Sequence, residues 1–397
     1  MSDTPRREFL GAAAAGLLLV KPQTAFSYQA NSTVELGLIG CGSRGNWIAP
    51  LFQEFTGARI AAVADVVQKN LDTTREKFNV AAARSFYGPQ AFAELSESKV
   101  DAVVIETPPY YHPEHAMAAV NAGKHVYLAK PVAVDPPGCH TIEGAGKKAL
   151  GKTSFFVDFQ TRAQPVFQEA VERARRGDIG KIAFVEAIYF AGRPWNGTPD
   201  PTDSDKTRLM TFYMDKVLGG DIIVEQNIHT IDVVNWFLGA HPLKAFGTGG
   251  RTDWKGTKWE IGDAYDHFLV TYFYPGDVQV QFASNQLTNS YNDIAVRCFG
   301  IKGSVDAHYN GLVRITGENA WKGSDKDDTF RQGAINNAKA FVESIRSGKP
   351  LNNTEDAVTS TLTAILGRSA AYRSGTVTWD EMLQRNEKLT ANLKLRW

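Results

Sequence analysis

A glycine-rich turn is the first segment of this sequence that could perform chemistry. Gly40, Gly42 and Gly45 form a G-x-G-x-x-G pattern between an apolar run and a helical pattern. In that context the glycines allow a tight turn, let the backbone approach a pyrophosphate, and let the following helix pack on the strand. The positive end of that helix attracts the phosphates. We therefore predict a dinucleotide site that includes these glycines together with Ser43 and Arg44.

An acidic residue after the second apolar run bears on the choice of cofactor. Asp65 follows Gly45 by twenty residues and ends the segment AAVAD. A carboxylate at this place can accept hydrogen bonds from the adenosine ribose, and it would repel a 2′-phosphate. No arginine follows directly, and Lys69 is the one cation close by. The sequence thus favours NAD over NADP.

A second set of residues suits acid–base chemistry. Glu225, His229 and Asp232 follow an i, i+4, i+7 spacing, which predicts that they share one face of a helix. Histidine titrates near neutral pH and is therefore suited to proton transfer. Such a stripe is by itself more commonly a solvated face, and its histidine more commonly structural.

The elements that must position these residues follow a regular order. From residue 34, apolar runs rich in Val and Ile alternate with helical periods, which predicts an α/β fold with an N-terminal doubly wound parallel sheet of about six strands. We place this Rossmann domain at residues 33–159. Residues 160–397 change character, and alternation such as Val278 to Phe282 after the turn at Pro275 predicts an α+β domain with a large open, mainly antiparallel sheet.

Composition narrows the class of protein. The 397 residues suit two domains, and with 43% apolar and 22% charged residues they are typical of a soluble globular protein. Lys plus Arg equals Asp plus Glu at 43 each, so no net field favours nucleic acid or an anionic membrane. Three scattered cysteines leave at most one disulfide and form no metal-binding motif, and we predict no metal site.

The first 32 residues are typical of an export signal. Arg6 and Arg7 precede Phe9 and Leu10, and a short apolar run follows that is too short to span a bilayer. This pattern predicts a twin-arginine signal, whose pathway exports folded proteins, and hence a periplasmic or secreted protein. The alternatives are a basic tail or an uncleaved anchor.

Two further segments, together with the glycine turn, carry a resemblance to a known family. The first runs from Thr107 through His112 to Pro131, and the second from Gly219 to Asp232. The sequence resembles the Gfo/Idh/MocA oxidoreductases, named for glucose-fructose oxidoreductase and inositol dehydrogenase. The resemblance extends from the first strand to the final helix.

The resemblance implies a role for several residues. Lys130 and Pro131 match the family's Glu-Lys-Pro motif, in which the lysine lies at the nicotinamide edge and the proline is commonly cis. Ala129 stands where the family has glutamate, so a carboxylate expected near the nicotinamide ribose is missing. His229 maps onto the catalytic proton acceptor and Glu225 onto its partner. Thr107, Pro108 and His112 are implied to bind the cofactor, and Tyr111 and His112 to approach the nicotinamide.

These assignments imply hydride transfer between a secondary hydroxyl of a sugar or polyol and the nicotinamide cofactor. His229 would remove the hydroxyl proton, and Lys130 would stabilise the oxygen. The residues whose side chains suit a sugar are Gln160, Arg162, Arg193, Trp195, Asn196 and Asp232, with Tyr213 and Lys216 as weaker candidates.

Export bears on the reaction cycle, because no maintained NAD pool exists outside the cytoplasm. A secreted member would carry a tightly bound cofactor and couple oxidation of one sugar to reduction of another. One alternative is glycoside cleavage through a transient keto-sugar, and another is a non-catalytic protein that binds dinucleotide or carbohydrate. The open sheet further predicts a homo-oligomer.

Overall fold

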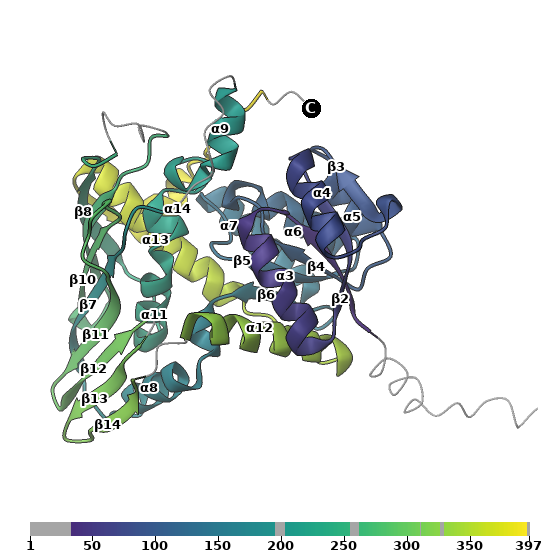
Figure 1. Cartoon of the computed structure of the whole chain (residues 1–397). Coiled ribbons are helices and arrows are strands. Elements are labelled where there is room, and N and C mark those ends of the chain that lie inside the picture. The colour runs from purple at the N-terminus through teal and green to yellow at the C-terminus, as the bar shows by residue number, and fades with distance from the viewer. Residues whose placement is uncertain (1–32, 195–202, 255–261, 310, 326–328, 395–397) are drawn as a thin grey trace, which may run out of the picture.

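The structure is a computed structural model that describes residues 33–194, 203–254, 262–309, 311–325 and 329–394. The expected export signal, residues 1–32, lies outside the described residues. Two sheets dominate the fold, with most of the helices between them or on the outer sides of the first sheet (Figure 1). This arrangement confirms the predicted α/β class.

The first sheet is parallel and has six strands in the order β3-β2-β1-β4-β5-β6. Its central strands are buried on both faces, as their continuous apolar sequences predict. The order reverses between β1 and β4, which is where ligands bind in doubly wound folds. The strands are β1 (Glu35–Ile39), β2 (Arg59–Asp65), β3 (Ser85–Tyr87), β4 (Ala102–Ile105), β5 (His125–Ala129) and β6 (Phe155–Asp158).

Helices cover both faces of this sheet. They are α3 (Ser43–Thr56), α4 (Gln68–Lys77), α5 (Ala91–Glu97), α6 (His112–Asn121) and α7 (Pro136–Ala149), with 3₁₀ turns η1 (Ala82–Arg84) and η2 (Pro109–Tyr111). A helix from much later in the chain, α12 (Thr329–Arg346), joins the layer beside α3. Its Phe341 packs edge-on against Phe52 and Tyr127 in one buried cluster. The C-terminal part of the chain thus contributes to the first core.

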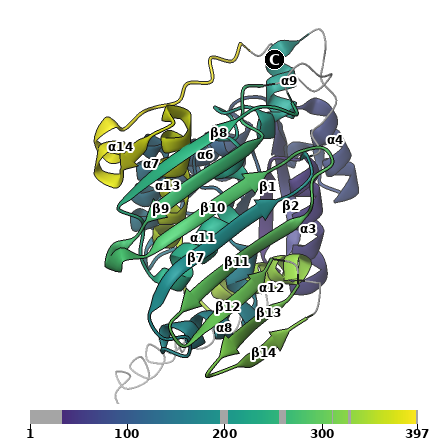
Figure 2. The same ribbon diagram turned by 90° about the vertical axis from the view of Figure 1, so that its left-hand side faces the viewer.

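The second sheet has nine strands in the order β14-β13-β12-β11-β7-β10-β9-β8-β15 (Figure 2). All neighbouring pairs are antiparallel except β7 and β10. The strands are β7 (Ile182–Phe190), β8 (Lys244–Gly250), β9 (His267–Phe273), β10 (Gln279–Asn285), β11 (Asp293–Gly300), β12 (Gly303–His308), β13 (Val313–Gly317), β14 (Trp321–Ser324) and β15 (Thr376–Thr378). The antiparallel β9–β10 pair confirms the pairing that we predicted around Pro275.

Helices separate the two sheets, and the opposite face of the second sheet has no helix over it among the described residues (Figures 1 and 2). The long α13 packs on α7 of the first domain and on β8 of the second sheet, and it is buried along most of its length. The elements of this part are η3 (Gln160–Ala163), α8 (Pro165–Arg175), α9 (Ser204–Met210), η4 (Phe212–Met214), α10 (Ile222–Glu225), α11 (Ile228–Leu238), η5 (Pro275–Asp277), α13 (Thr354–Arg373) and α14 (Trp379–Arg385).

Two further features concern the chain as a whole. Cys41, Cys139 and Cys298 are all buried and free, so they form no disulfide with one another. Within the described ranges, no helix combines the length and the apolar character that crossing a membrane requires.

Candidate active site

The glycine turn joins β1 to α3 and leaves room for a ligand. Gly40 has a φ of 96°, and a side chain there would meet the backbone of Glu106. A Cβ at Gly45 would lie 2.1 Å from the carbonyl oxygen of Gly40, so the close approach of α3 requires glycine. A Cβ at Gly42 would meet nothing within 4 Å. The turn therefore borders open space at the position where a pyrophosphate would approach the backbone.

The start of α3 fits a phosphate as well. Its N-cap residue, Gly42, has no side chain to cap the helix, and its first turn contains no acidic residue, so the terminal N–H groups remain available for a ligand. Asp65, at the end of β2, accepts hydrogen bonds from the N–H groups of Cys41 and Val67, both at 2.6 Å. Burial raises the pKa of this carboxyl. Asp65 thus fixes the backbone of the glycine turn, and it lies at the strand end where an adenosine ribose would bind.

Lys130 connects the two halves of the molecule. It follows β5, and its bond to Pro131 is cis. Its ammonium donates to the backbone carbonyl of Glu225 and lies 3.2 Å from Oε1 of that residue's carboxylate. The other carboxylate oxygen accepts from Gln226, whose own amide oxygen accepts from Tyr189 at 3.1 Å. An ammonium has three donors, so one N–H of Lys130 remains for a substrate.

The prediction that Glu225, His229 and Asp232 share one helical face is wrong. Glu225 is the last residue of α10, and α11 begins only at Ile228. In a continuous helix the carbonyl of Glu225 would accept from the N–H of His229, but it accepts from Lys130, and the His229 N–H lies 3.4 Å from the Gln226 carbonyl. The lysine thus replaces a helical hydrogen bond, and the break lets the Glu225 carboxylate turn toward Lys130.

His229 makes its polar side-chain contact with Tyr309, which directly follows β12. The Tyr309 hydroxyl donates to Oε1 of Gln160 at 2.9 Å and lies 3.4 Å from Nδ1 of His229. Because the hydroxyl proton is committed to Gln160, the contact with His229 requires that Nδ1 carry the imidazole proton. Nε2 then holds the free lone pair, which is the form that a proton acceptor needs.

The environment keeps this imidazole neutral. His229 is 5% exposed, and its burial, together with the charges of Lys130 and Arg44, lowers its pKa well below the usual value. A neutral histidine can take a proton over a wide pH range. Tyr213, a weaker candidate from the sequence, lies in the same region, and burial together with the charge of Glu225 raises the pKa of its hydroxyl.

A buried charged cluster lies at the carboxyl ends of β4 and β6. Arg44 extends from the glycine turn, donates to Oδ2 of Asp158 at 2.5 Å, and lies 3.6 Å from the carboxylate of Glu106. Asn337 of α12 donates to the other oxygen of Asp158 at 2.7 Å. The Arg44 guanidinium also lies 4.5 Å from the ring centre of Trp47. Arg44 thus connects the glycine turn to the acidic residues at the ends of β4 and β6.

Thr107, Pro108 and His112 surround the ends of β4 and β5. The His112 ring nitrogens lie 2.7 Å from the carbonyl oxygen of Pro131 and 2.8 Å from that of Thr107. Burial lowers the pKa of His112 to about 4, so the neutral ring donates to one of these two carbonyls. The ring is 1% exposed. Its contacts join the loop after β4 to the carbonyl that follows Lys130.

The candidate substrate residues are dispersed. Arg162 and Asp232 bind each other through two donors of the guanidinium, at 2.9 to 3.1 Å, and Ser360 also donates to Asp232. Gln160 lies beside Tyr309, and its buried Nε2 has no hydrogen-bond partner in the part of the chain that the structure describes. Arg193 is partly buried after β7.

The remaining candidates give no further support. Trp195 and Asn196 lie outside the described residues. The ammonium of Lys216 packs on Tyr372, 4.2 Å from its ring centre.

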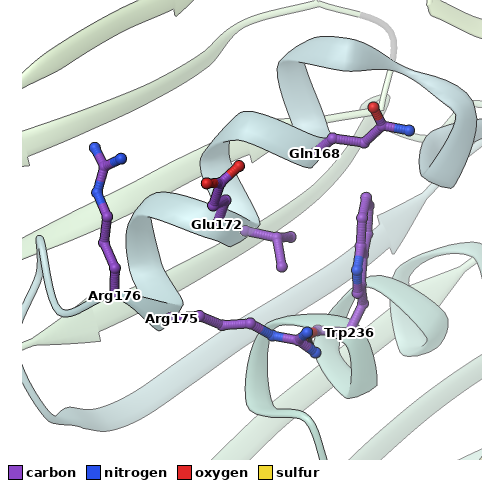
Figure 3. A pocket seen from close by; sticks show the side chains of 6 residues that line it. Gln168, Glu172, Arg175, Arg176 and Trp236 are labelled. Atoms are coloured by element: carbon purple, nitrogen blue, oxygen red, sulfur yellow. Dashed lines mark hydrogen bonds between the residues drawn. The ribbon is translucent and has the colours of Figure 1, made fainter.

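A shallow hollow on the surface lies apart from this chemistry (Figure 3). It has a volume of about 460 Å³ and is lined by Gln168, Val171, Glu172 and Arg175 of α8, by Arg176 directly after that helix, and by Trp236 of α11. Arg175 donates to the carbonyl of Trp236 at 2.5 Å. None of the acid–base residues lines this hollow, so we assign the chemistry to the cluster around Lys130 and His229.

Four residues of the cluster were not predicted from the sequence, namely Glu106, Asp158, Tyr189 and Tyr309. Glu106 and Asp158 each follow or end a buried apolar strand, and a polar residue at that place was a usable signal. Tyr189 and Tyr309 carry no comparable local signal, because their contacts depend on how the second sheet packs against α11.

A doubly wound sheet with an open glycine turn, joined to a domain that brings a histidine to a strand-end lysine, defines a two-domain oxidoreductase with a dinucleotide-binding Rossmann fold. Residues 34–152 match the family model of the oxidoreductase family with NAD-binding Rossmann fold, and residues 167–306 match the GFO/IDH/MocA C-terminal domain. The chain belongs to the GFO/IDH/MocA oxidoreductase family.

Relatives and solved structures resemble the chain over most of its length. Myo-inositol 2-dehydrogenase of Thermotoga maritima is 25% identical over 326 residues, which are 80% of this chain and 90% of that protein. The scyllo-inositol dehydrogenase of Lactobacillus casei, solved with bound NAD(H) and scyllo-inositol, has a TM-score of 0.68 at 20% identity and covers 88% of this chain and 100% of its own. The aldose-aldose oxidoreductase of Caulobacter crescentus, solved with glycerol, has a TM-score of 0.70 at 20% identity, with coverages of 87% and 100%.

Proposed function

We propose that this protein transfers a hydride between a secondary hydroxyl of a sugar or polyol and NAD. The carrying observation is that Lys130 of the first domain binds Glu225, four residues before His229, and that the charge of Lys130 acts on the His229 imidazole. The inositol dehydrogenases among the relatives support a polyol, and the aldose-aldose oxidoreductase supports a sugar.

His229 serves as the proton acceptor. Its Nδ1–H faces the Tyr309 hydroxyl, which leaves the Nε2 lone pair for the hydroxyl proton of the substrate. Its lowered pKa keeps it unprotonated at neutral pH, so it is ready to accept that proton. Tyr309 and Gln160 hold the ring in the required tautomer.

Lys130 stabilises the oxygen from which the proton leaves. Its free N–H can donate to that oxygen, whose negative charge grows as the proton departs. The bonds to the carbonyl and carboxylate of Glu225 hold the ammonium in place. The glycine turn and Asp65 would hold NAD, which when bound would supply the hydride acceptor.

The cofactor is retained through the catalytic cycle under this proposal. The pattern at Arg6 and Arg7 supports export of the folded chain, and a retained NAD would be reduced by one sugar and reoxidised by a second. Asp65, without an arginine beside it, supports NAD over NADP.

The test begins with the purified full chain and no added cofactor. Denaturing the protein and identifying the released nucleotide should give stoichiometric NAD. The intact protein is then incubated with aldoses, polyols and glycosides, and keto-sugar, lactone and reduced polyol are measured. Products of paired oxidation and reduction support the proposal. Release of free sugar from glycosides with no oxidised product would contradict it, and so would absence of any nucleotide binding.

We also propose that the chain forms a homo-oligomer through the outer face of the second sheet. Phe246, Leu269 and Phe299 point to this face and are 46%, 58% and 39% exposed. Substituting Leu269 by Glu should lower the molar mass measured by light scattering. An unaltered chain that is monomeric at all concentrations would contradict the proposal.

A further inference from the structure

Glu106 is a buried carboxylate without a donor. It follows β4, its side chain has no exposed surface, and neither of its oxygens has a hydrogen-bond partner among the described residues. The nearest cation is Arg44, 3.6 Å from Oε2 through its Nε atom. Leaving the oxygens of a buried carboxylate without a hydrogen-bond donor is costly even beside a cation, and such a group is rarely kept without a function. A donor that belongs to a ligand would satisfy it.

The place of Glu106 in the sheet indicates which ligand supplies the donor. The pairing of Ile105 with Leu128 sets Glu106 level with Ala129, and Ala129 in turn pairs with Asp158. Residues at one level of parallel strands share a face of the sheet. Glu106, just after β4, thus lies on the same side as Ala129 and Asp158, the last residues of β5 and β6, and the Ala129 side chain carries no polar atom.

Asp158 is less suited than Glu106 to replace the carboxylate that is absent at position 129. Its two oxygens already accept from Arg44 and Asn337. The backbone of Glu106, in contrast, touches the glycine turn directly, because a Cβ at Gly40 would lie 2.8 Å from the Glu106 carbonyl oxygen. A dinucleotide that crosses the turn at the β1–β4 reversal places its second nucleoside over β4 and β5.

We propose that Glu106 binds the hydroxyl groups of the nicotinamide ribose, in place of a carboxylate at position 129. The inference rests on the proposed function, since it requires that the chain bind NAD. The two ribose hydroxyls are neutral donors that match the two oxygens of Glu106, neither of which accepts a hydrogen bond among the described residues. Asp65 and Glu106 then hold the two riboses at opposite sides of the glycine turn.

The test compares three ligands on nucleotide-free full chain by titration calorimetry. NAD carries both riboses and the nicotinamide, ADP-ribose carries both riboses without the ring, and ADP carries only the adenosine half. Glu106→Gln should weaken NAD and ADP-ribose about tenfold or more and leave ADP unchanged. Glu97→Gln, an exposed glutamate on α5, is the matched control and should change none of the three.

A second substitution tests the equivalence of the two strand ends. Adding Ala129→Glu to Glu106→Gln should restore at least half of the lost binding free energy for NAD and ADP-ribose. Equal affinity of Glu106→Gln and the unaltered chain for all three ligands overturns the inference, and so does a loss confined to NAD, which would place the contact on the ring. No recovery in the double variant overturns it as well.

A measurement on the unaltered chain covers the case in which Glu106→Gln does not fold. Burial raises the pKa of Glu106 to about 8, with Arg44 and Lys130 opposing the shift and Asp158 adding to it. ADP-ribose should therefore bind more tightly as the pH rises from 7 to 9, while ADP should not. Equal pH dependence of the two ligands overturns the inference. If the unaltered chain binds none of the ligands, the proposed function fails too.

Discussion

The Lys130 ammonium donates to both the backbone carbonyl and the side-chain carboxylate of Glu225, and it thereby joins the Rossmann strand β5 to the helical segment that carries His229. The two contacts do different things. The first ends α10 and separates Glu225 from α11, and the second holds the lysine beside the histidine. The geometry of the site therefore depends on a contact between residues that are distant in the sequence.

Replacing Lys130 by Met should lower kcat about 100- to 1000-fold, because the developing charge on the substrate oxygen loses its donor. NAD affinity should change little. Single-turnover reduction of the cofactor with the best substrate of the panel measures the first effect, and calorimetry measures the second. Lys147→Met, on the exposed face of α7, is the control. Full activity of Lys130→Met would refute the role assigned to the lysine.

The pH profile of kcat/KM should lack an acidic limb near 6.5. Burial and the charges of Lys130 and Arg44 lower the pKa of His229, so the imidazole stays neutral and able to accept a proton well below pH 6.5. The profile is measured from pH 5 to 9 in buffers of constant ionic strength. A loss of activity centred at pH 6.5 would show that the imidazole titrates normally.

Tyr309→Phe removes the hydroxyl between His229 and Gln160. We expect kcat to fall about tenfold, with KM and NAD affinity unchanged, because the imidazole loses the contact that fixes its tautomer. Nitrogen chemical shifts of His229 should show a mixture of tautomers, which a purely structural role would not produce. Tyr291→Phe, at a side chain that is 76% exposed, should match the unaltered protein in both measurements.

Asp232→Asn should act on stability more than on substrate binding. Asp232 is fully buried and paired with Arg162, so removing its charge leaves the guanidinium without its buried partner and should lower the free energy of unfolding by about 3 kcal/mol. Asp356→Asn removes the exposed partner of the same arginine and should cost less than about 0.5 kcal/mol. Denaturant titration measures both. A large increase in KM with unchanged stability would instead favour a substrate-binding role for Asp232.

Acid should destabilise the protein through its buried histidines. Burial lowers the pKa of His112 to about 4 and that of His115 to about 3, whereas the unfolded chain takes up these protons near pH 6.5. The stability they support is thus complete above pH 6.5 and is lost as the pH falls toward the folded-state values, by about 1.4 kcal/mol per histidine and pH unit.

The measurement is the free energy of unfolding between pH 7 and 4.5. His115→Phe keeps the stacking on Phe92 and should make the slope shallower by the contribution of one group. His140→Gln, at a half-exposed side chain on α7, should leave the slope unchanged. The same slope in all three proteins would show that His115 is protonated in the folded chain.

Much of the fold was determined by local sequence. The alternation of apolar runs and helical periods predicts the first sheet, because the hydrophobic pattern within each segment is enough to distinguish a strand from a helix. The glycines at positions 40 and 45 were equally readable, because a positive φ and a close helix approach exclude other side chains. Lys130 and His229 stood out by their motifs.

Only the tertiary structure decided how the site is assembled. The spacing of Glu225 and His229 predicts one helix, but Lys130, distant in the sequence, takes the carbonyl that would have continued it. Asp232 turned out to be paired with Arg162, and Glu106 lies level with Ala129 through strand pairing. Hydrogen bonds and ion pairs of this kind join residues far apart along the chain, and local periodicity carries no information about which partners the packed core brings together.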